Sequence, residues 1–365
     1  MKGELGGLRP NPYLSPMKFE EWLRPTRAGL ACLPGGFTID PVTPVDRAVI
    51  THGHGDHARP GNGHVLATPE TIAIMQARFG AEAGRSLQPL AYGERLELGG
   101  LSLRFVPAGH VLGSAQLVIE HAGSRAVVSG DYKRRPDPTC APFEPVTCDL
   151  FVTEATFGLP IFRHPDDRGE IGKLLASIAL FPERTHLVGT YALGKAQRVL
   201  ALLRRAGWDR PIWLHGALFP LTEVYRRFGC DFGELRAATA AARADLRGEI
   251  VLAPPGAIRD RWSRRMAEPL HAVASGWMAV RARARQAGAE LPLVISDHAD
   301  WTELTETMQE VGAAEVWVTH GLEEGLLRYG QSAGIATRAL SLVGYEEDGE
   351  EESGKEGSGK EENGA

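Results

Sequence analysis

The sequence predicts an α/β protein in which a second α/β unit is inserted into the first, and three observations support this. Up to residue 128, short apolar runs alternate with glycine- and proline-rich stretches, which is typical of β-strands and turns. Residues 169–289 alternate helical patterns with short apolar runs, as in a parallel sheet with helical connections. After residue 290, two strand-like runs end beside histidines, so we expect the chain to return to its first unit.

The first unit is expected to begin with an irregular, proline-rich lead-in over residues 1–30 that holds a short helix near residues 19–23. The strand-like runs that follow occupy residues 37–39, 48–50, 101–106 and 116–120. One helix is predicted over residues 69–79, because Thr68 can cap its N-terminus and Ile72 and Met75 can face a core. A buried strand is predicted over residues 149–154 and ends in the carboxylate of Glu154.

The inserted unit is expected to alternate helices and strands. The predicted helices occupy residues 171–180, 192–206, 235–244 and 279–287. The predicted strands occupy residues 186–190, 211–214 and 250–253, and the returning strands residues 291–296 and 314–319. Several arginine clusters, among them residues 259–265 and 281–285, could line a phosphate groove or could be ordinary solvated helix faces.

Charge is distributed unevenly along the chain. The 365 residues are 43% hydrophobic, as in a globular protein, and carry a formal net charge of −6. Residues 346–365 hold nine acidic residues and two lysines, a net charge of −7, which leaves +1 for residues 1–345. This acidic tail is too polar to offset the entropy of ordering it, and we expect it to be disordered. A solubilising tail is the simplest interpretation, although such a tail can also compete with nucleic acid.

The apolar runs of the sequence are all far shorter than the ~18 residues of a membrane span, and the first residues lack the apolar core of a signal peptide. We therefore expect a cytoplasmic protein with no membrane partner. The four cysteines lack the C-x-x-C spacing of a zinc knuckle or redox motif and are expected to be reduced thiols. Composition leaves the oligomeric state open.

The most informative stretch is His52-Gly53-His54-Gly55-Asp56-His57, which directly follows the apolar run over residues 47–51. Three imidazoles and a carboxylate this close together are costly unless they hold a metal, and these donors suit zinc, manganese and iron. The alternative is a solvated turn that happens to be rich in histidine. Four donors spaced as H-x-H-x-D-H are improbable by chance, so we interpret the stretch as a metal-binding loop.

Further potential donors follow strand-like runs in a fixed order. Asp40 ends the run over residues 37–39, His110 follows Pro107-Ala108-Gly109, and Asp131 follows the run over residues 126–130. Together with the H-x-H-x-D-H loop, this order resembles the signature of the metallo-β-lactamase superfamily. The resemblance implies the fold of that family, an αββα sandwich.

A second layer of motifs narrows the resemblance. Residues 153–158, 296–300 and 318–321 resemble motifs A, B and C of the β-CASP branch, which acts on nucleic acid, and residues 191–197 resemble its cap motif. Combined with residues 109–116, 129–133 and 138–143, they are similar to the bacterial DNA-ligase-associated exonuclease family, often labelled mRNA 3′-end processing factors. This resemblance spans residues 30–340. It implies a metallo-β-lactamase domain over residues 1–168 and 290–345, an inserted β-CASP cap over residues 169–289 and the tail over residues 346–365.

The resemblance also implies a set of metal ligands for two divalent cations, zinc or manganese. One ion is expected to be held by the imidazoles of His52, His54 and His110. The second is expected to be held by Asp56, His57 and His298, with Asp131 bridging the two ions.

Other residues are expected to act beside the metals. Asp40 and Glu154 are expected to accept hydrogen bonds from ligating histidines. His320 could protonate the leaving 3′ oxygen, or could make only a structural hydrogen bond. Together with the ligand Asp56, these three are the residues expected to take part in catalysis. Basic side chains expected to contact backbone phosphates are Lys195, Arg198 and Lys133.

The family implies a metal-dependent DNA exonuclease that hydrolyses phosphodiester bonds at DNA ends during repair, through a water activated by two metal ions. Functional association with a DNA ligase follows from the same resemblance. A β-CASP ribonuclease is the alternative, because a histidine at motif C, here His320, is more typical of RNA-directed members. A catalytically silent nucleic-acid-binding scaffold would usually lack ligands, and a small-ester hydrolase would need neither motifs A to C nor a cap. The polarity of digestion and the preference for ends over internal bonds are left open.

Overall fold

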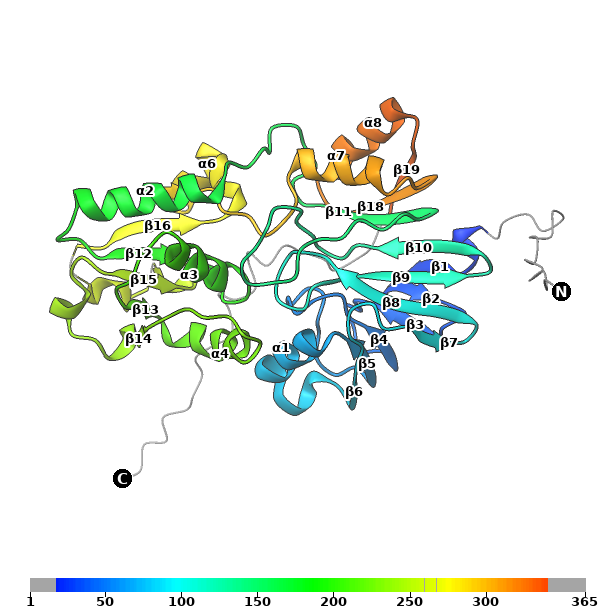
Figure 1. The fold of residues 1–365 in the computed structure, drawn as a ribbon, viewed down its shortest axis with the longest axis horizontal. Helices are drawn as coiled ribbons and strands as arrows, with labels where there is room; N and C mark the ends of the chain where they lie inside the picture. The colour runs from blue at the N-terminus through cyan, green and yellow to red at the C-terminus, as the bar shows by residue number, and fades with distance from the viewer. Residues whose placement is uncertain (1–17, 259, 267, 341–365) are drawn as a thin grey trace, which may run out of the picture.

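The computed structural model describes residues 18–340 apart from Arg259 and Ala267. Figure 1 shows two lobes. One contains two sheets and the helices α1, α7 and α8, and the other contains a third sheet with the helices α2, α3, α4 and α6. The acidic tail over residues 346–365 lies outside the described residues. None of the described helices has the length and apolarity needed to cross a membrane.

The first sheet has six strands in the order of the chain, β1-β2-β3-β4-β5-β6. They span Leu23–Thr26, Gly29–Cys32, Phe37–Ile39, Arg47–Val49, His64–Ala67 and Ser86–Pro89. The strands from β1 to β3 pair antiparallel, and those from β3 to β6 pair parallel. The irregular lead-in predicted up to residue 30 is therefore wrong from residue 23 onward. Pro25 argued against a strand here and so hid the β1–β2 hairpin from prediction. A proline is tolerated in β1 because β1 is an edge strand.

The second sheet has seven strands in the order β19-β18-β11-β10-β9-β8-β7. In chain order, β7 to β11 span Leu96–Leu98, Leu101–Pro107, Ala115–His121, Ser124–Val128 and Leu150–Ala155, and β18 and β19 span Glu315–Gly321 and Ala336–Ala339. The strands from β7 to β10 pair antiparallel, whereas β10, β11, β18 and β19 pair parallel.

The two sheets enclose one core and are covered by helices on their outer faces. Side chains such as Phe37 and Leu66 from the first sheet join Phe105 and Trp317 from the second in one buried cluster. Helix α1, Pro69–Phe79, covers the first sheet, and α7, Trp301–Glu310, and α8, Glu323–Ala333, cover the second. The side chain of Thr68 caps α1, as predicted. This order of layers, helix, sheet, sheet, helix, confirms the predicted αββα sandwich.

The third sheet is wholly parallel, in the order β14-β13-β15-β12-β16-β17. In chain order, β12 to β17 span His186–Gly189, Ile212–Leu214, Leu235–Ala237, Ile250–Ala253, Leu270–Ala274 and Leu291–Leu293. The helices of this lobe are α2, Asp167–Leu180; α3, Lys195–Arg205; α4, Phe219–Arg227; and the short α5, Pro255–Ile258, and α6, Arg281–Gln286. Because β17 pairs with β16, the strand predicted over residues 291–296 belongs to this sheet and not to the sandwich.

One predicted helix in this lobe is wrong and another was missed. Residues 235–244 form β14 and turns of 3₁₀-helix, because β14 pairs with β13 at the edge of the sheet. Their alanine content favours a helix, so tertiary pairing overrides propensity here. Helix α4 was not predicted, although Pro220 occupies its first turn, where proline is tolerated. The domain boundaries at residues 168 and 289 stay predictions.

Candidate metal centre

The H-x-H-x-D-H loop begins just after β4 and packs tightly against its surroundings. A Cβ atom added to Gly53 would lie 2.5 Å from Cγ2 of Ile74 on α1, so only glycine lets the loop approach the helix this closely. On the other side, a Cβ added to Gly130 would lie 2.7 Å from Oγ1 of Thr51, and Gly130 has a positive φ of 54°. These contacts fix the loop beside Asp131, which follows β10.

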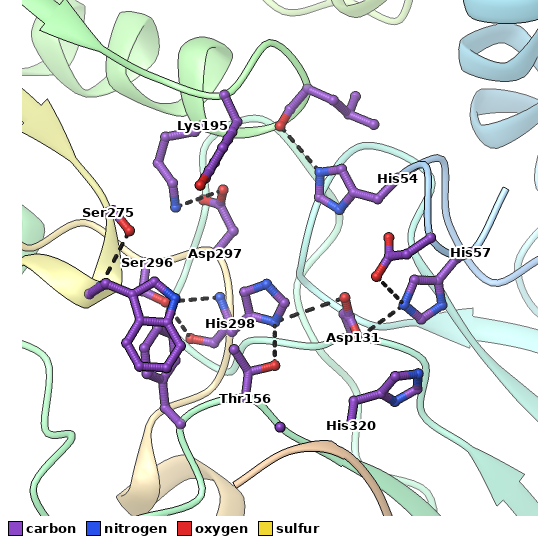
Figure 2. Close-up of a pocket in the computed structure, with 17 residues that line it drawn as sticks. His54, His57, Asp131, Thr156, Lys195, Ser275, Ser296, Asp297, His298 and His320 are labelled. Carbon is purple, nitrogen blue, oxygen red and sulfur yellow. Dashed lines mark hydrogen bonds and ion pairs between the residues drawn. The ribbon is translucent and has the colours of Figure 1, made fainter. Parts of the chain in front are cut away.

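The seven predicted metal ligands are brought together in the structure. Potential donor atoms lie within 4.8 Å of one another in three overlapping groups: His52, His54, His110 and Asp131; His52, Asp56 and His57; and Asp131, Glu154 and His298. Figure 2 shows His57 and His298 on either side of Asp131. Asp131 belongs to two of these groups. Its Oδ2 lies 3.5 Å from Nε2 of His52, and its Oδ1 lies 3.5 Å from Nε2 of His57, a residue of the remaining group. That position suits a bridging carboxylate.

Hydrogen bonds set the orientation of two of these imidazoles. Nδ1 of His57 lies 2.8 Å from Oδ2 of Asp40, and Nδ1 of His298 lies 2.9 Å from Oε2 of Glu154. Because an ionised carboxylate only accepts hydrogen bonds, each Nδ1 carries a proton, and whenever the ring is neutral its lone pair is on Nε2. The other oxygens of the carboxylates are also engaged, Oδ1 of Asp40 by the Thr51 amide and Oε1 of Glu154 by the Tyr132 amide.

The same reasoning applies to His110 and His54. Nδ1 of His110 donates to the carbonyl of Asp297 at 2.8 Å, which leaves a lone pair on its Nε2. Nε2 of His54 lies 3.3 Å from the carbonyl of Leu193, which leaves a lone pair on its Nδ1. These two nitrogens face each other at 2.9 Å. Two lone pairs repel at that distance unless a proton or a metal ion lies against both, and this pair can therefore accept a metal ion.

His52 completes the set of donors. Its ring is fully buried, and its Nδ1 lies 3.2 Å from Oγ1 of Thr51, which itself donates to Asp40. Its Nε2 makes no hydrogen bond and points at Asp131. Buried polar atoms are nearly always satisfied, so such a nitrogen calls for a partner. Imidazole nitrogens and carboxylate oxygens are the donors that zinc and manganese accept, and the residues therefore fit divalent cations.

The electrostatics of the cluster are dominated by burial. Burial and the neighbouring histidines hold the pKa of His52 and of His110 well below the ordinary value. For His298 burial acts in the same direction, but Glu154 and Asp131 outweigh it and raise its pKa to about 9. Burial raises the pKa of Asp131 to about 7, against the effect of His57. Protons and metal ions therefore compete for these atoms.

His320 and Asp40 share an unusual backbone conformation. Their φ angles are +57° and +42°, in the left-handed region that non-glycine residues rarely adopt. Such conformations cluster at functional sites. The His320 ring lies 5.3 Å from the ring of His57, centroid to centroid. Burial, followed by the charges of His57 and His298, keeps its pKa well below the usual value, so the imidazole is neutral near pH 7.

A cleft opens beside these donors, between the two lobes. Its sandwich side is lined by His54, Asp56, His57, Asp131, His298 and His320. The third-sheet lobe contributes mainly Tyr191, Leu193, Lys195 and the turn Ser275-Gly276-Trp277. The predicted motifs A, B and C therefore meet the predicted cap motif across one cleft.

The prediction that Arg198 and Lys133 contact phosphates is wrong, because both side chains are fully buried. Nζ of Lys133 pairs with Oδ2 of Asp137 at 2.6 Å. The Arg198 guanidinium faces three carboxylates, those of Asp137, Asp167 and Asp297. Buried cations need such partners, and paired inside the protein they are not free to bind a polyanion.

Lys195 is also paired, but it reaches the cleft. Its Nζ lies 2.8 Å from Oδ2 of Asp297, and its side chain lines the cleft wall. Burial lowers its pKa to about 8, partly offset by the carboxylate of Asp297. The role of Lys195 as a phosphate contact stays a prediction.

Asp297 and Trp277 are site residues that sequence reasoning missed. Asp297 lies within the predicted motif B, but nothing in the sequence indicated that its backbone carbonyl would orient His110 while its carboxylate pairs with Lys195 and Arg198 of α3. Trp277 has no motif around it. Its place in the cleft depends on the third sheet.

Comparison with known proteins adds a family and several relatives. Residues 11–165 match the model of the Beta-lactamase superfamily domain. A probable DNA ligase of Opitutus terrae is 29% identical over 294 residues, which cover 78% of this chain and 28% of that protein. Ribonuclease TTHA0252 of Thermus thermophilus is 33% identical, over 52% of this chain and 47% of that protein. Cleavage and polyadenylation specificity factor subunit 3 of Dictyostelium discoideum is 27% identical, over 51% and 28%.

The chain thus spans less than half the length of each of these curated relatives. Among solved structures, a protein of unknown function from Enterococcus faecalis V583 aligns with a TM-score of 0.56 and 14% identity, over 82% of this chain and 80% of that one. At that identity the likeness shows a shared fold and nothing further.

Proposed function

We propose that this chain, residues 11–165 of which match the Beta-lactamase superfamily domain, is a metal-dependent nuclease that hydrolyses phosphodiester bonds at DNA ends. The observation that carries the proposal is the cluster of buried imidazoles and carboxylates at the foot of the cleft between the lobes. Its potential donor atoms form three overlapping groups beside the cleft, and the cleft gives a polymer access to them.

The residues proposed to hold the two ions are the seven ligands predicted from the sequence, with Asp131 between the sites. When bound, two divalent cations lower the pKa of a water and neutralise charge that develops on a phosphate. Asp40 and Glu154 keep the imidazoles of His57 and His298 in one tautomer and one orientation. Lys195 adds positive charge where the phosphate would lie, and the hydroxyl groups of Thr156 and Ser275 line the same cleft.

DNA is the proposed substrate because the longest match reported above is to a protein named as a probable DNA ligase. It covers 294 residues, whereas the match to the ribonuclease covers 219. A segment like this chain inside a ligase would supply ends that the ligase can seal. We therefore propose end processing in DNA repair, in the cytoplasm and in association with a ligase.

An RNA substrate is the second candidate. It is favoured by the relatives named as a ribonuclease and as a cleavage and polyadenylation factor, and by the presence of His320 at the position of motif C. Hydrolysis by the same cluster would serve either polymer, since the chemistry acts on the phosphodiester that both share.

Digestion of end-labelled nucleic acid tests the proposal. Single- and double-stranded DNA and RNA of matched sequence are offered to the protein after chelation and after addition of zinc or manganese. We expect metal-dependent loss of DNA with RNA spared, and the position of the label reports polarity. Preferential cleavage of RNA would support the second candidate, and binding without cleavage would identify a silent scaffold.

A further inference from the structure

Trp277 stands in the wall that the third-sheet lobe presents to the predicted metal ligands. It lies on the short turn Gly276–Ala279 and is only partly buried. Its side chain lines the same cleft as His298, Asp131 and Lys195. Hydrolysis by the metal cluster does not by itself require this indole.

The ring of Trp277 is held firmly from several sides. Its centroid lies 4.8 Å from that of Phe157 and 5.3 Å from that of Phe162, and the Arg283 guanidinium lies over the ring at 5.3 Å. A Cβ added to Gly276 would lie 2.5 Å from Cζ of Phe157, so the turn rests directly on that ring. An aromatic group fixed in advance loses little entropy when a ligand packs on it.

The same packing ties Trp277 to the metal ligands. Phe157 follows Glu154 by three residues, and Glu154 holds His298 at 2.9 Å. The Phe157 ring lies 6.2 Å from the His298 ring, centroid to centroid. The segment 154–157 therefore carries both the carboxylate that orients a ligand and the ring that supports the indole, so their separation is fixed.

We infer that Trp277 is the stacking platform for a nucleobase next to the phosphate under attack, and that the substrate is a single-stranded or frayed end. This inference rests on the proposed function. The buried donors and Lys195 suit a phosphate, whereas a partly exposed indole in the same cleft suits the flat face of a base. Such stacking tolerates every base, because each has a π-face. Inside a duplex, neighbouring base pairs cover both faces of every base except the terminal one, so a base further inside can stack on the indole only after the end has opened.

The first experiment leaves the protein unchanged. Binding of the wild-type protein to short fluorescein-labelled single strands is measured in chelator, where hydrolysis is stopped. One set of strands carries an abasic site, moved one position at a time from the end. We expect one position at which loss of the base weakens binding by roughly 5- to 150-fold, the range found for single-strand stacking residues.

The second experiment uses Trp277→Ala, with Trp277→Phe as the conservative variant. Trp277→Ala should lose the same factor on intact strands and nothing further on the strand with the sensitive abasic site, and Trp277→Phe should restore most of the affinity. Trp208→Ala is the matched control, because Trp208 also pairs with an arginine, Arg210, but does not line the cleft. It should bind like the wild type.

The outcomes separate the inference from the function on which it rests. If wild type binds and cleaves nucleic acid but no abasic position matters, the stacking platform is refuted and the nuclease stands. Equal losses for Trp277→Ala on intact and abasic strands would likewise refute it, since they would indicate a change of cleft shape alone. If wild type neither binds nor cleaves any nucleic acid, the proposed function itself fails.

Discussion

The buried guanidinium of Arg198 is expected to be one of the largest single contributions to the stability of this protein. It is fully buried and faces the carboxylates of Asp137, Asp167 and Asp297. Burial alone would lower its pKa, but these carboxylates outweigh burial and raise it above the ordinary value. Arg198→Met keeps an unbranched side chain and removes the charge.

The expected magnitude follows from what the substitution leaves behind. Asp137 keeps Lys133 and Asp297 keeps Lys195, so the loss is close to that of one buried ion-pair partner. Removing one partner of a buried pair costs ~3–5 kcal/mol, or roughly 150- to 5,000-fold in the folding equilibrium. Urea unfolding followed by circular dichroism measures this change in the free energy of unfolding.

Arg247→Met is the matched control, because Arg247 pairs with Glu183 at 2.9 Å while the two side chains are 61% and 70% exposed. Exposed pairs of this kind contribute less than about 1 kcal/mol. If Arg198→Met were no less stable than Arg247→Met, the buried network would not hold the two lobes as the contacts indicate.

Three further outcomes are expected. Asp56→Ala and His298→Ala should abolish cleavage and leave nucleic-acid binding largely intact, and gel shifts beside digestion assays check this; full activity in either variant would exclude it from the ligand set. Glu154→Gln should weaken metal affinity by ~10- to 100-fold, because it orients His298 less well, and competition with a chromophoric chelator measures the loss. The pKa of Asp137 is lowered, since Lys133 and Arg198 outweigh burial. The ionised carboxylate therefore contributes stability above its unfolded-state pKa, near 4, and this contribution is lost as pH falls through the lower folded-state pKa. Urea midpoints should drop below about pH 4, and they should drop less steeply in Asp137→Asn.

The αββα sandwich could be predicted because its signals are local. Each predicted ligand of the first domain follows a strand-like run, and the carboxyl ends of parallel strands such as β3 and β4 meet at one edge of a sheet. The H-x-H-x-D-H loop therefore predicted both the end of a strand and a metal-binding site. Asp40 and Asp131 were predicted as site residues in the same way, because each is a carboxylate at the end of a strand-like run.

The third-sheet lobe was harder to predict, for a physical reason. Its strands are short, and their partners are distant in sequence, so pairing rather than propensity decides the alanine-rich residues 235–244. The burial of Arg198 and Lys133 could not be predicted from the sequence either. A sequence shows that a side chain is charged, but the three carboxylates that surround Arg198 come from separate segments.

We propose that the buried cluster holds two divalent cations and hydrolyses DNA ends. The most direct measurement titrates zinc or manganese into the metal-free protein while release of nucleotides from a labelled single-stranded DNA end is followed. A site for two ions should give no release in chelator, and a rate that rises until two equivalents of metal are bound. Undiminished release in the presence of chelator, or no release at saturating metal, would contradict it.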